Sequence, residues 1–204
     1  RVAEVWFGSR EAVEMVPVTR EGGLQALLNG EVDVLAGGWI QSRELELQAD
    51  TSLVLFDDGV SLFSLSAAPY RTLQELVGRP VGVVANSDGA AAIPQLTQLA
   101  GGPLNALSYP TRDEAVAALQ RGEVVAVLAE RGLVLSPLYR QAGFTLADAR
   151  LTYRPVSYVL PQGDSNFRDW FNETLMQLHD NGVFREVYTT WFDDPAPAAP
   201  LWPR

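Results

Sequence analysis

Several residue types that carry protein chemistry are absent from this sequence. None of its 204 residues is a cysteine, which excludes disulfides, zinc–thiolate sites and cysteine nucleophiles. Lysine is absent too, so all 15 basic residues are arginine, and Schiff-base or P-loop chemistry through lysine is excluded. His179 is the only histidine, and nothing in the sequence places it near Ser87, so no Ser-His-Asp triad is predicted. Metal-ligand spacing is absent, and no cofactor is predicted.

The hydrophobic pattern and the charge exclude further classes of protein. No apolar run approaches the ~18 residues of a membrane span. The net charge of −10 argues against binding to nucleic acid and to anionic membranes, which both require clustered basic residues. Hydrophobic residues make up 47% of the chain and charged residues 20%, which is typical of a globular protein of one domain or two small ones. The charge says little about a small ligand.

One segment of the chain occurs twice. Residues 19–38 read TREGGLQALLNGEVDVLAGG, and residues 111–130 read TRDEAVAALQRGEVVAVLAE, at a constant offset without a gap. Two copies are too few for a solenoid, which needs at least three repeats to bury a continuous core. They are compatible with two similar lobes facing each other, and a cleft between lobes is a common place for a small-molecule site.

Each copy predicts a β-α-β unit. The Thr-Arg-acid start can cap a helix with apolar residues at helical spacing, and a glycine, Gly30 or Gly122, ends that helix. Strands that are apolar throughout indicate a parallel sheet covered by helices on both faces. The expected strands lie at Val13–Val18, Val32–Ala36, Ala106–Tyr109 and Val124–Ala129.

The rest of the chain fits two α/β lobes. Asp57-Asp58-Gly59 is a turn signal between two strands within Leu53–Leu65, and we favour this over a general acid/base pair. Pro94 either kinks the helix that follows Asp88 or begins a new one. The last residues, DDPAPAAPLWPR, are predicted to be extended or disordered. Further strands are expected at Val81–Ala85 and Pro155–Leu160, and further helices at Leu73–Val77, from Ser165 to about Asn181 and at Val183–Phe192.

Three stretches resemble the family 3 extracellular solute-binding proteins, the amino-acid receptors of bacterial ABC importers. LQALLNGEVDVLAGGWIQSRE resembles the family's helix, G-x-V-D-V strand and polar loop ending in arginine. LQELVGRPVGVVANSDG resembles the family's L-x-x-L-x-G-x-x-V-G-V-x-x-G-[ST]-[ST] stretch. GVFREVYTTWF resembles the C-terminal end of family members. Each stretch alone is weak evidence, but together they span nearly the whole chain.

This resemblance implies two α/β lobes joined by two crossover strands, a fold of the type II periplasmic-binding class, which close on the ligand by hinge motion. The first lobe is expected at residues 1–66 plus 158–192 and the second at 67–157, followed by the tail at 193–204. The crossovers are expected near Ser64–Tyr70 and Arg150–Ser157.

The start of the chain departs from the family pattern. The opening RVAEVWFG is typical of the last turns of a helix, and we expect a mature or truncated product. Family members have a strand and a helix before this point, and that strand lies in the middle of the first lobe's sheet. Without it, backbone groups beside Val13–Val18 and Val32–Ala36 would be unpaired, at about 1–3 kcal/mol for each buried group. We therefore expect that the native protein contains this segment or that a neighbouring chain, as in a dimer, fills its place.

In the first lobe, Arg43 matches the family arginine that binds the ligand α-carboxylate, a role suited to a bidentate guanidinium. The alternative is an exposed arginine paired with Glu44 or Glu46. Gly38 stands where the family usually has Thr or Ser, so only the backbone amide remains for the ligand. Trp39 and Phe56 are candidate aromatic walls of the site, although most aromatic residues of this kind belong to a core.

In the second lobe, Glu130 ends the repeat strand where the family places an aspartate for the ligand ammonium. The alternative is a surface pair of Glu130 with Arg131. Ser87 matches a family hydroxyl at a helix N-terminus that favours anions. Asp88 stands where the family has Ser or Thr, and it would repel a ligand carboxylate unless it pairs with a cation; the alternative is an N-cap.

The resemblance implies a periplasmic or extracellular binding protein, not an enzyme, that passes a small polar solute, such as an amino acid or an analogue, to an ABC permease. One alternative is a sensor domain of a membrane receptor or kinase. Another is an enzyme on the same fold, similar to cyclohexadienyl dehydratase, which needs a carboxylic acid with a raised pKa and no competing arginine. Gly38 and Asp88 weaken the usual carboxylate anchor, so an unusual or cationic ligand is also compatible with the sequence.

Overall fold

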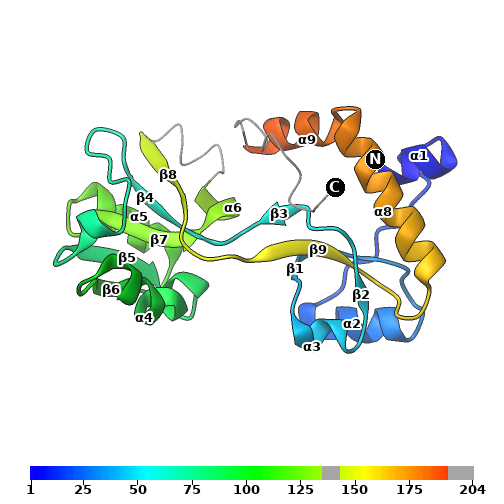
Figure 1. Ribbon diagram of the computed structural model, residues 1–204, viewed down its shortest axis with the longest axis horizontal. Coiled ribbons are helices and arrows are strands. Elements are labelled where there is room, and N and C mark those ends of the chain that lie inside the picture. Colours follow the sequence, from blue (N-terminus) through cyan, green and yellow to red (C-terminus); the bar gives the residue numbers. More distant parts are fainter. Residues whose placement is uncertain (135–142, 193–204) are drawn as a thin grey trace. The chain divides into compact units, whose positions relative to one another are not determined.

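The computed structural model describes residues 1–134 and 143–192, so the tail expected at 193–204 lies outside the described residues. The chain divides into two compact units that both combine strands with helices (Figure 1). Unit 1 contains Arg1–Asp57 and Pro155–Thr189, and unit 2 contains Asp58–Arg154 and, at the end of α9, the described residues 190–192. The chain therefore passes between the units at Asp57–Asp58 and at Arg154–Pro155.

Unit 2 contains a five-stranded mixed sheet in the order β6-β5-β7-β4-β8. Strand β5 (Pro80–Val84) is parallel to β6 (Asn105–Tyr109) and to β7 (Ala126–Glu130). Strand β4 (Val60–Leu65) is antiparallel to β7 and to β8 (Phe144–Arg150). The helices of this unit are η1 (Gln74–Leu76), α4 (Asp88–Ala100), α5 (Arg112–Gln120) and α6 (Arg131–Val134).

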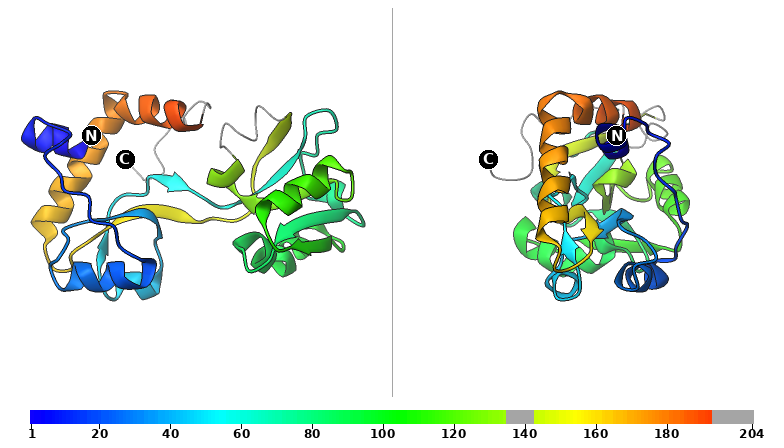
Figure 2. Two further views of the ribbon diagram at one scale, coloured as in Figure 1. Left: turned by 180° about the vertical axis from the view of Figure 1, so that it is seen from behind. Right: turned by 90° about the vertical axis from the view of Figure 1, so that its right-hand side faces the viewer.

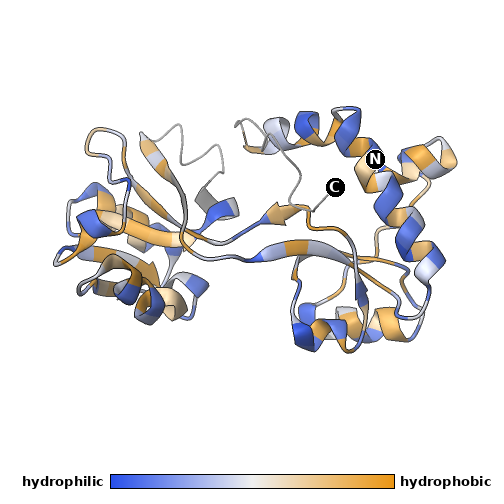
Figure 3. Cartoon of the chain, in the orientation of Figure 1, coloured by the Kyte–Doolittle hydropathy of each residue, from blue (hydrophilic) through white to orange (hydrophobic). Residues whose placement is uncertain are grey.

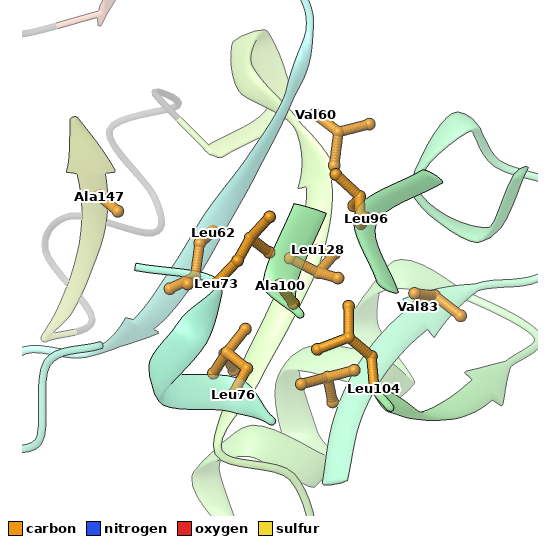
Figure 4. Close-up of a cluster of buried hydrophobic side chains, with 12 residues drawn as sticks. Val60, Leu62, Leu73, Leu76, Val83, Leu96, Ala100, Leu104, Leu128 and Ala147 are labelled. Carbon is orange, nitrogen blue, oxygen red and sulfur yellow. The ribbon is translucent and has the colours of Figure 1, made fainter. Parts of the chain in front are cut away.

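Alternating side chains of the central strands build one core on each face of this sheet. On one face Leu62 of β4 and Leu128 of β7 pack with Leu96 of α4 (Figure 4). On the other face their chain neighbours Phe63 and Val127 pack with α5. Because both faces are covered, these strands are apolar along their length, as predicted for a sheet between helices. The predicted parallel pairing is found for β6, β5 and β7, whereas β4 is antiparallel to its neighbours.

Unit 1 is built on β9 (Pro155–Leu160), which pairs antiparallel with β1 (Leu35–Ile40), β2 (Asp50–Thr51) and β3 (Phe56–Asp57). Among the described residues β1 has β9 as its only strand partner. The helices are α1 (Val2–Phe7), α2 (Arg20–Leu28), α3 (Arg43–Glu46), α8 (Ser165–Asp180) and α9 (Val183–Phe192).

An aromatic cluster joins α1 to α8 in unit 1. The rings of Trp6 and Trp170 stack at 4.1 Å, and the Trp6 indole N–H donates to the Thr174 hydroxyl at 2.7 Å. The two helices lie side by side in the views of Figure 2. Hydrophilic and hydrophobic stretches alternate along α8 (Figure 3), because only one side of this helix packs on β9 through Phe171.

The helix of the sequence repeat is also repeated in the structure, but only the second copy forms the predicted β-α-β unit, β6-α5-β7; no strand precedes α2 among the described residues, and β1 pairs antiparallel with β9. The hydroxyls of Thr19 and Thr111 accept the amide protons of Gly22 and Glu114 at the starts of α2 and α5. Both helices end in the same way, because Gly30 and Gly122 have φ values of 71° and 73°. The Thr-to-Gly pattern therefore predicted the helix and both of its ends correctly.

Three expectations about the elements are wrong. Residues 13–18 form no strand, because Val13–Val18 runs exposed without ladder partners among the described residues. The first repeat strand is Leu35–Ile40 rather than Val32–Ala36, since its pairing with β9 decides where it begins. Thirdly, no new helix begins at Pro94, because the described helix α4 continues through this residue, which lies on its exposed side. The alternative of a kink at Pro94 stays a prediction.

Strand β4 falls in the stretch that the sequence analysis assigned to the first lobe. In the structure it pairs with β7 and β8 of unit 2, so the first passage between units comes before it, at Asp57–Asp58, rather than near Ser64–Tyr70. The second passage, at Arg154–Pro155, lies within the expected segment 150–157.

Removing the helix cap of α5 should destabilise unit 2. We expect Thr111→Ala to lower the free energy of unfolding by about 1 kcal/mol, because the Glu114 amide loses its acceptor. Urea titration followed by circular dichroism measures the change. Thr111→Ser retains the hydroxyl and should behave like the parent protein; equal loss in both variants would contradict a capping role.

The stability of the protein should decline at alkaline pH through Tyr158. Burial raises the pKa of the Tyr158 phenol, whereas an unfolded tyrosine has a pKa of about 10. The native state holds this proton more tightly, so its contribution is complete below about pH 10 and is lost as the pH rises through the higher native pKa. Tyr158→Phe should reduce the loss of stability above about pH 10 in urea titrations, whereas Tyr153→Phe, at an exposed tyrosine, should not.

Candidate functional site

The first turn of α4 lies directly against the backbone of β7. A side chain at Gly89 would collide with the carbonyl oxygen of Leu128, and Gly89 is buried. Only glycine permits this approach. The N-terminus of α4 therefore lies beside Leu128, near the end of β7 and two residues before Glu130.

The alternation along β7 places Glu130 on the side of the sheet that α4 covers. Ala126 and Leu128 belong to the core beneath α4, and in a strand every second residue shares a face. One carboxylate oxygen of Glu130, Oε1, accepts the backbone N–H of Asp88 at 3.1 Å. Two candidate residues that lie 42 positions apart in the sequence are thus brought together.

The hydroxyl of Ser87 forms its hydrogen bonds within the turn that precedes α4. It donates to the Val84 carbonyl at 2.7 Å and accepts the Ala90 amide at 3.2 Å. A hydroxyl has one proton to donate, so the Ser87 proton is already used by Val84. Ser87 is the N-cap of α4, and the alternative that assigned the cap to Asp88 is wrong.

Asp88 has the cation that the sequence analysis required of it. Its carboxylate forms an ion pair with the guanidinium of Arg154, the last residue of unit 2 before the chain passes to β9. Both side chains are partly exposed, so the pair adds little to stability. It nevertheless balances the negative charge at the start of α4.

Further groups that the sequence analysis did not select surround this point. The Asp58 carboxylate accepts the Gly132 amide at 2.6 Å, and the Asp58 amide donates to the Arg154 carbonyl at 2.9 Å. The sequence analysis assigned Asp58 to a turn. No sequence pattern marked Arg154 as a site residue; it was placed only within the expected crossover. Arg131 forms no ion pair with Glu130 among the described residues; instead its amide donates to the Gly59 carbonyl at 3.1 Å.

In unit 1, Gly38 and Trp39 lie in an irregular part of β1. The register of the pairing with β9 shifts between Leu35 and Trp39, and Gly37 and Gly38 have φ values of 108° and 70°. A Cβ at Gly38 would meet no atom within 4 Å. The left-handed backbone, not crowding, therefore favours glycine here over the Thr or Ser of the family pattern.

Trp39 and Phe56 both pack within unit 1. Trp39 is half-buried beside α2, with the Arg20 guanidinium 5.2 Å from its ring centre. Phe56, on β3, packs against Tyr188 of α9, with 6.1 Å between the centres of the two rings. These contacts favour the core interpretation of both residues, and their role as aromatic walls stays a prediction.

Arg43 is the first residue of α3, which Ser42 caps through the Leu45 amide at 3.2 Å. Its side chain is exposed, and among the described residues its guanidinium has neither a hydrogen-bond nor an ion-pair partner. The expected alternative, an ion pair with Glu44 or Glu46, is not found in that part of the chain. A guanidinium held this way is available to an incoming anion.

Neither a metal centre nor a membrane helix is found in the described ranges. No group of three or more His, Asp or Glu side chains there could hold a metal ion. Within the same residues, no helix combines the length and the apolar character needed to cross a bilayer.

The comparison with protein families defines the class. The model of the bacterial extracellular solute-binding proteins, family 3, matches residues 8–194. The chain belongs to this family.

Curated relatives include glutamate/aspartate-binding proteins of two bacteria. The L-glutamate/L-aspartate-binding protein of Pseudomonas aeruginosa is 20% identical over 183 residues, which cover 88% of this chain and 61% of the relative. The glutamate/aspartate import solute-binding protein of Salmonella typhimurium is 19% identical over 188 residues, which cover 91% and 62%. The chain thus spans about three fifths of the length of these relatives.

Solved structures share the fold at low identity. An ancestral cationic amino acid solute binding protein matches with a TM-score of 0.74 and 21% identity, over 88% of this chain and 78% of that one. Substrate binding domain 2 of GlnP from Lactococcus lactis matches with a TM-score of 0.77 and 11% identity, over 90% and 79%. The fold is the mixed α/β type II periplasmic-binding fold that the sequence predicted.

Substituting Gly89 tests the close approach of α4 to β7. We expect Gly89→Ala to cost about 1–3 kcal/mol of unfolding free energy, because the new methyl group collides with the Leu128 carbonyl. Denaturant titration provides the measurement. Ala91→Ser, on the exposed side of the same helix, should be close to neutral. A neutral Gly89→Ala would show that α4 can shift from β7 without cost.

Proposed function

We propose that this protein is the ligand-binding component of an amino-acid importer of the ABC type, which binds its solute without chemical change. Membership of the solute-binding family supports this role. The single observation that carries it is the exposed, unpaired guanidinium of Arg43 at the position of the family's carboxylate-binding arginine.

Two charged side chains supply the amino-acid recognition in this proposal. Arg43 of unit 1 binds the α-carboxylate through two charge-assisted hydrogen bonds. Glu130 of unit 2 binds the α-ammonium. Its carboxylate accepts the Asp88 amide, and a carboxylate can accept about four hydrogen bonds. Trp39 and Phe56 remain proposed contacts of the ligand side chain, and Gly38 a proposed backbone contact.

An amino acid is the ligand class that the comparisons favour. The curated relatives carry names of glutamate/aspartate-binding proteins, and another relative, from Escherichia coli, is named a putative amino-acid ABC transporter-binding protein. Binding rather than catalysis is favoured by the site itself. Asp88 is paired with Arg154, and Glu130 accepts a hydrogen bond from the Asp88 backbone N–H, so neither is placed as a general acid of a dehydratase.

The partners and the location follow from this role. We propose that the protein works outside the cytoplasmic membrane, in the periplasm or at the cell surface, and passes its ligand to a membrane permease. The family is described as extracellular, in agreement with this location. A sensor role for the same binding domain would use the same ligand contacts but a different partner.

A thermal-shift screen against the common amino acids tests the proposal. A ligand that binds only the native state raises the melting temperature, with about 2.7 kcal/mol of added stability at 100 times its Kd. We expect a shift with at least one amino acid, and we expect Arg43→Ala to raise the Kd of that ligand roughly tenfold to a hundredfold through the loss of charge-assisted bonds.

Arg112→Ala is the matched control, because Arg112 is an exposed arginine at the start of α5. It should leave the shift unchanged. If no amino acid shifts the melting temperature, or if Arg43→Ala and Arg112→Ala behave alike, the proposed function is wrong.

A further inference from the structure

Two proposed ligand contacts of unit 1, Gly38 and Trp39, lie in the irregular part of β1. The register of β1 against β9 shifts between Leu35 and Trp39, and the backbone at Gly38 is left-handed. Where a strand departs from the regular ladder, pairing holds it less completely. Contacts from outside the sheet therefore help to fix this part of β1.

The first turn of α2 supplies such contacts. The guanidinium of Arg20 lies 5.2 Å from the centre of the Trp39 ring, and its Nη1 donates a long hydrogen bond of 3.5 Å to the Gly38 carbonyl. A Cβ at Gly23, three residues further along α2, would lie 3.3 Å from the same ring. Trp39 therefore meets both the arginine side chain and the backbone of the helix.

Arg20 is not needed to start α2. The Thr19 hydroxyl caps this helix by accepting the Gly22 amide, and a positive charge in the first turn opposes the helix dipole. The Arg20 side chain is exposed and has no ion-pair partner among the described residues. The contacts with β1 are thus the interactions that a change of this side chain would remove.

The second copy of the repeat offers an internal comparison. Arg112 stands at the start of α5, where Arg20 stands at the start of α2. The position equivalent to Trp39 is Arg131, so the second copy has no aromatic ring there. In the part of the chain that the structure describes, Arg112 makes neither of the two contacts found for Arg20. The contact with β1 is therefore particular to the first copy.

We infer that Arg20 is a positioning residue of the proposed site: by holding the Trp39 ring and the Gly38 carbonyl, it fixes the irregular part of β1 and raises ligand affinity without contacting the ligand. The inference rests on the proposed function, because Gly38 and Trp39 are proposed ligand contacts. The interaction needs a cation and an aromatic face together. Loss of either partner should therefore have the same consequence.

Acrylamide quenching of tryptophan fluorescence tests the contact without any ligand. We expect Arg20→Gln to increase quenching, because the guanidinium no longer covers the Trp39 ring. In a Trp39→Leu background the same substitution should give no increase, which separates Trp39 from the other tryptophans. Arg112→Gln is the matched control and should leave quenching unchanged. No increase with Arg20→Gln, or an equal increase in both backgrounds, would overturn the inference.

A double-mutant cycle on ligand affinity tests the positioning role. For the amino acid with the largest thermal shift, we expect Arg20→Gln to raise the Kd roughly threefold to tenfold, the scale of one cation–π contact. In the Trp39→Leu background the same change should alter the Kd by less than about twofold, because coupled residues are not additive. Arg20→Lys keeps the cation and should retain most of the affinity. Arg112→Gln should leave the Kd unchanged.

The outcomes separate this inference from the proposed function. Equal Kd values for Arg20→Gln and Arg112→Gln, or additive losses from Arg20→Gln and Trp39→Leu, would overturn the positioning role while ligand binding itself stands. Failure of every amino acid to bind would overturn both. If Trp39→Leu abolishes binding, retention of affinity in Arg20→Lys but not in Arg20→Gln decides the question. Arg20→Met replaces Arg20→Gln if melting curves show that the latter does not fold.

Discussion

The contact between Gly89 and the backbone of β7 is the constraint on which the candidate site of unit 2 depends. Because no side chain separates them, the first turn of α4 lies at the level of Leu128, and the Asp88 amide reaches Glu130. A side chain at this position would push the helix away and separate the two candidate residues. The absence of a Cβ at Gly89 therefore allows Asp88, at the start of α4, and Glu130, at the end of β7, to lie close together.

The charges at this point differ from those of a simple anion site. A helix N-terminus stabilises nearby carboxylates, so α4 can hold Asp88 and Glu130 close together, and Arg154 balances one of the two charges. Each of these contacts is modest, since the side chains are partly exposed to water.

The two copies of the repeat form the same capped helix but lead into strands with different surroundings. Thr19 and Thr111 cap their helices in the same way, because capping depends on neighbours within three residues. The strands that follow differ: Glu130 ends a regular strand paired on both sides, whereas Gly38 lies in an irregular strand with a left-handed backbone. Equivalent positions in the sequence thus have different backbones and different proposed contacts.

The sequence by itself determined the α/β class, the family and most helices, because caps, helical spacing and glycine ends are local signals. It also selected Ser87, Asp88 and Glu130, which the structure brings together. Only the tertiary structure decided that Val13–Val18 is not a strand and that β4 belongs to unit 2. It also decided that Arg154 pairs with Asp88 and that Asp58 lies next to Arg154. Strand pairing and ion pairs join residues far apart in the chain, so no local pattern of residues can reveal them.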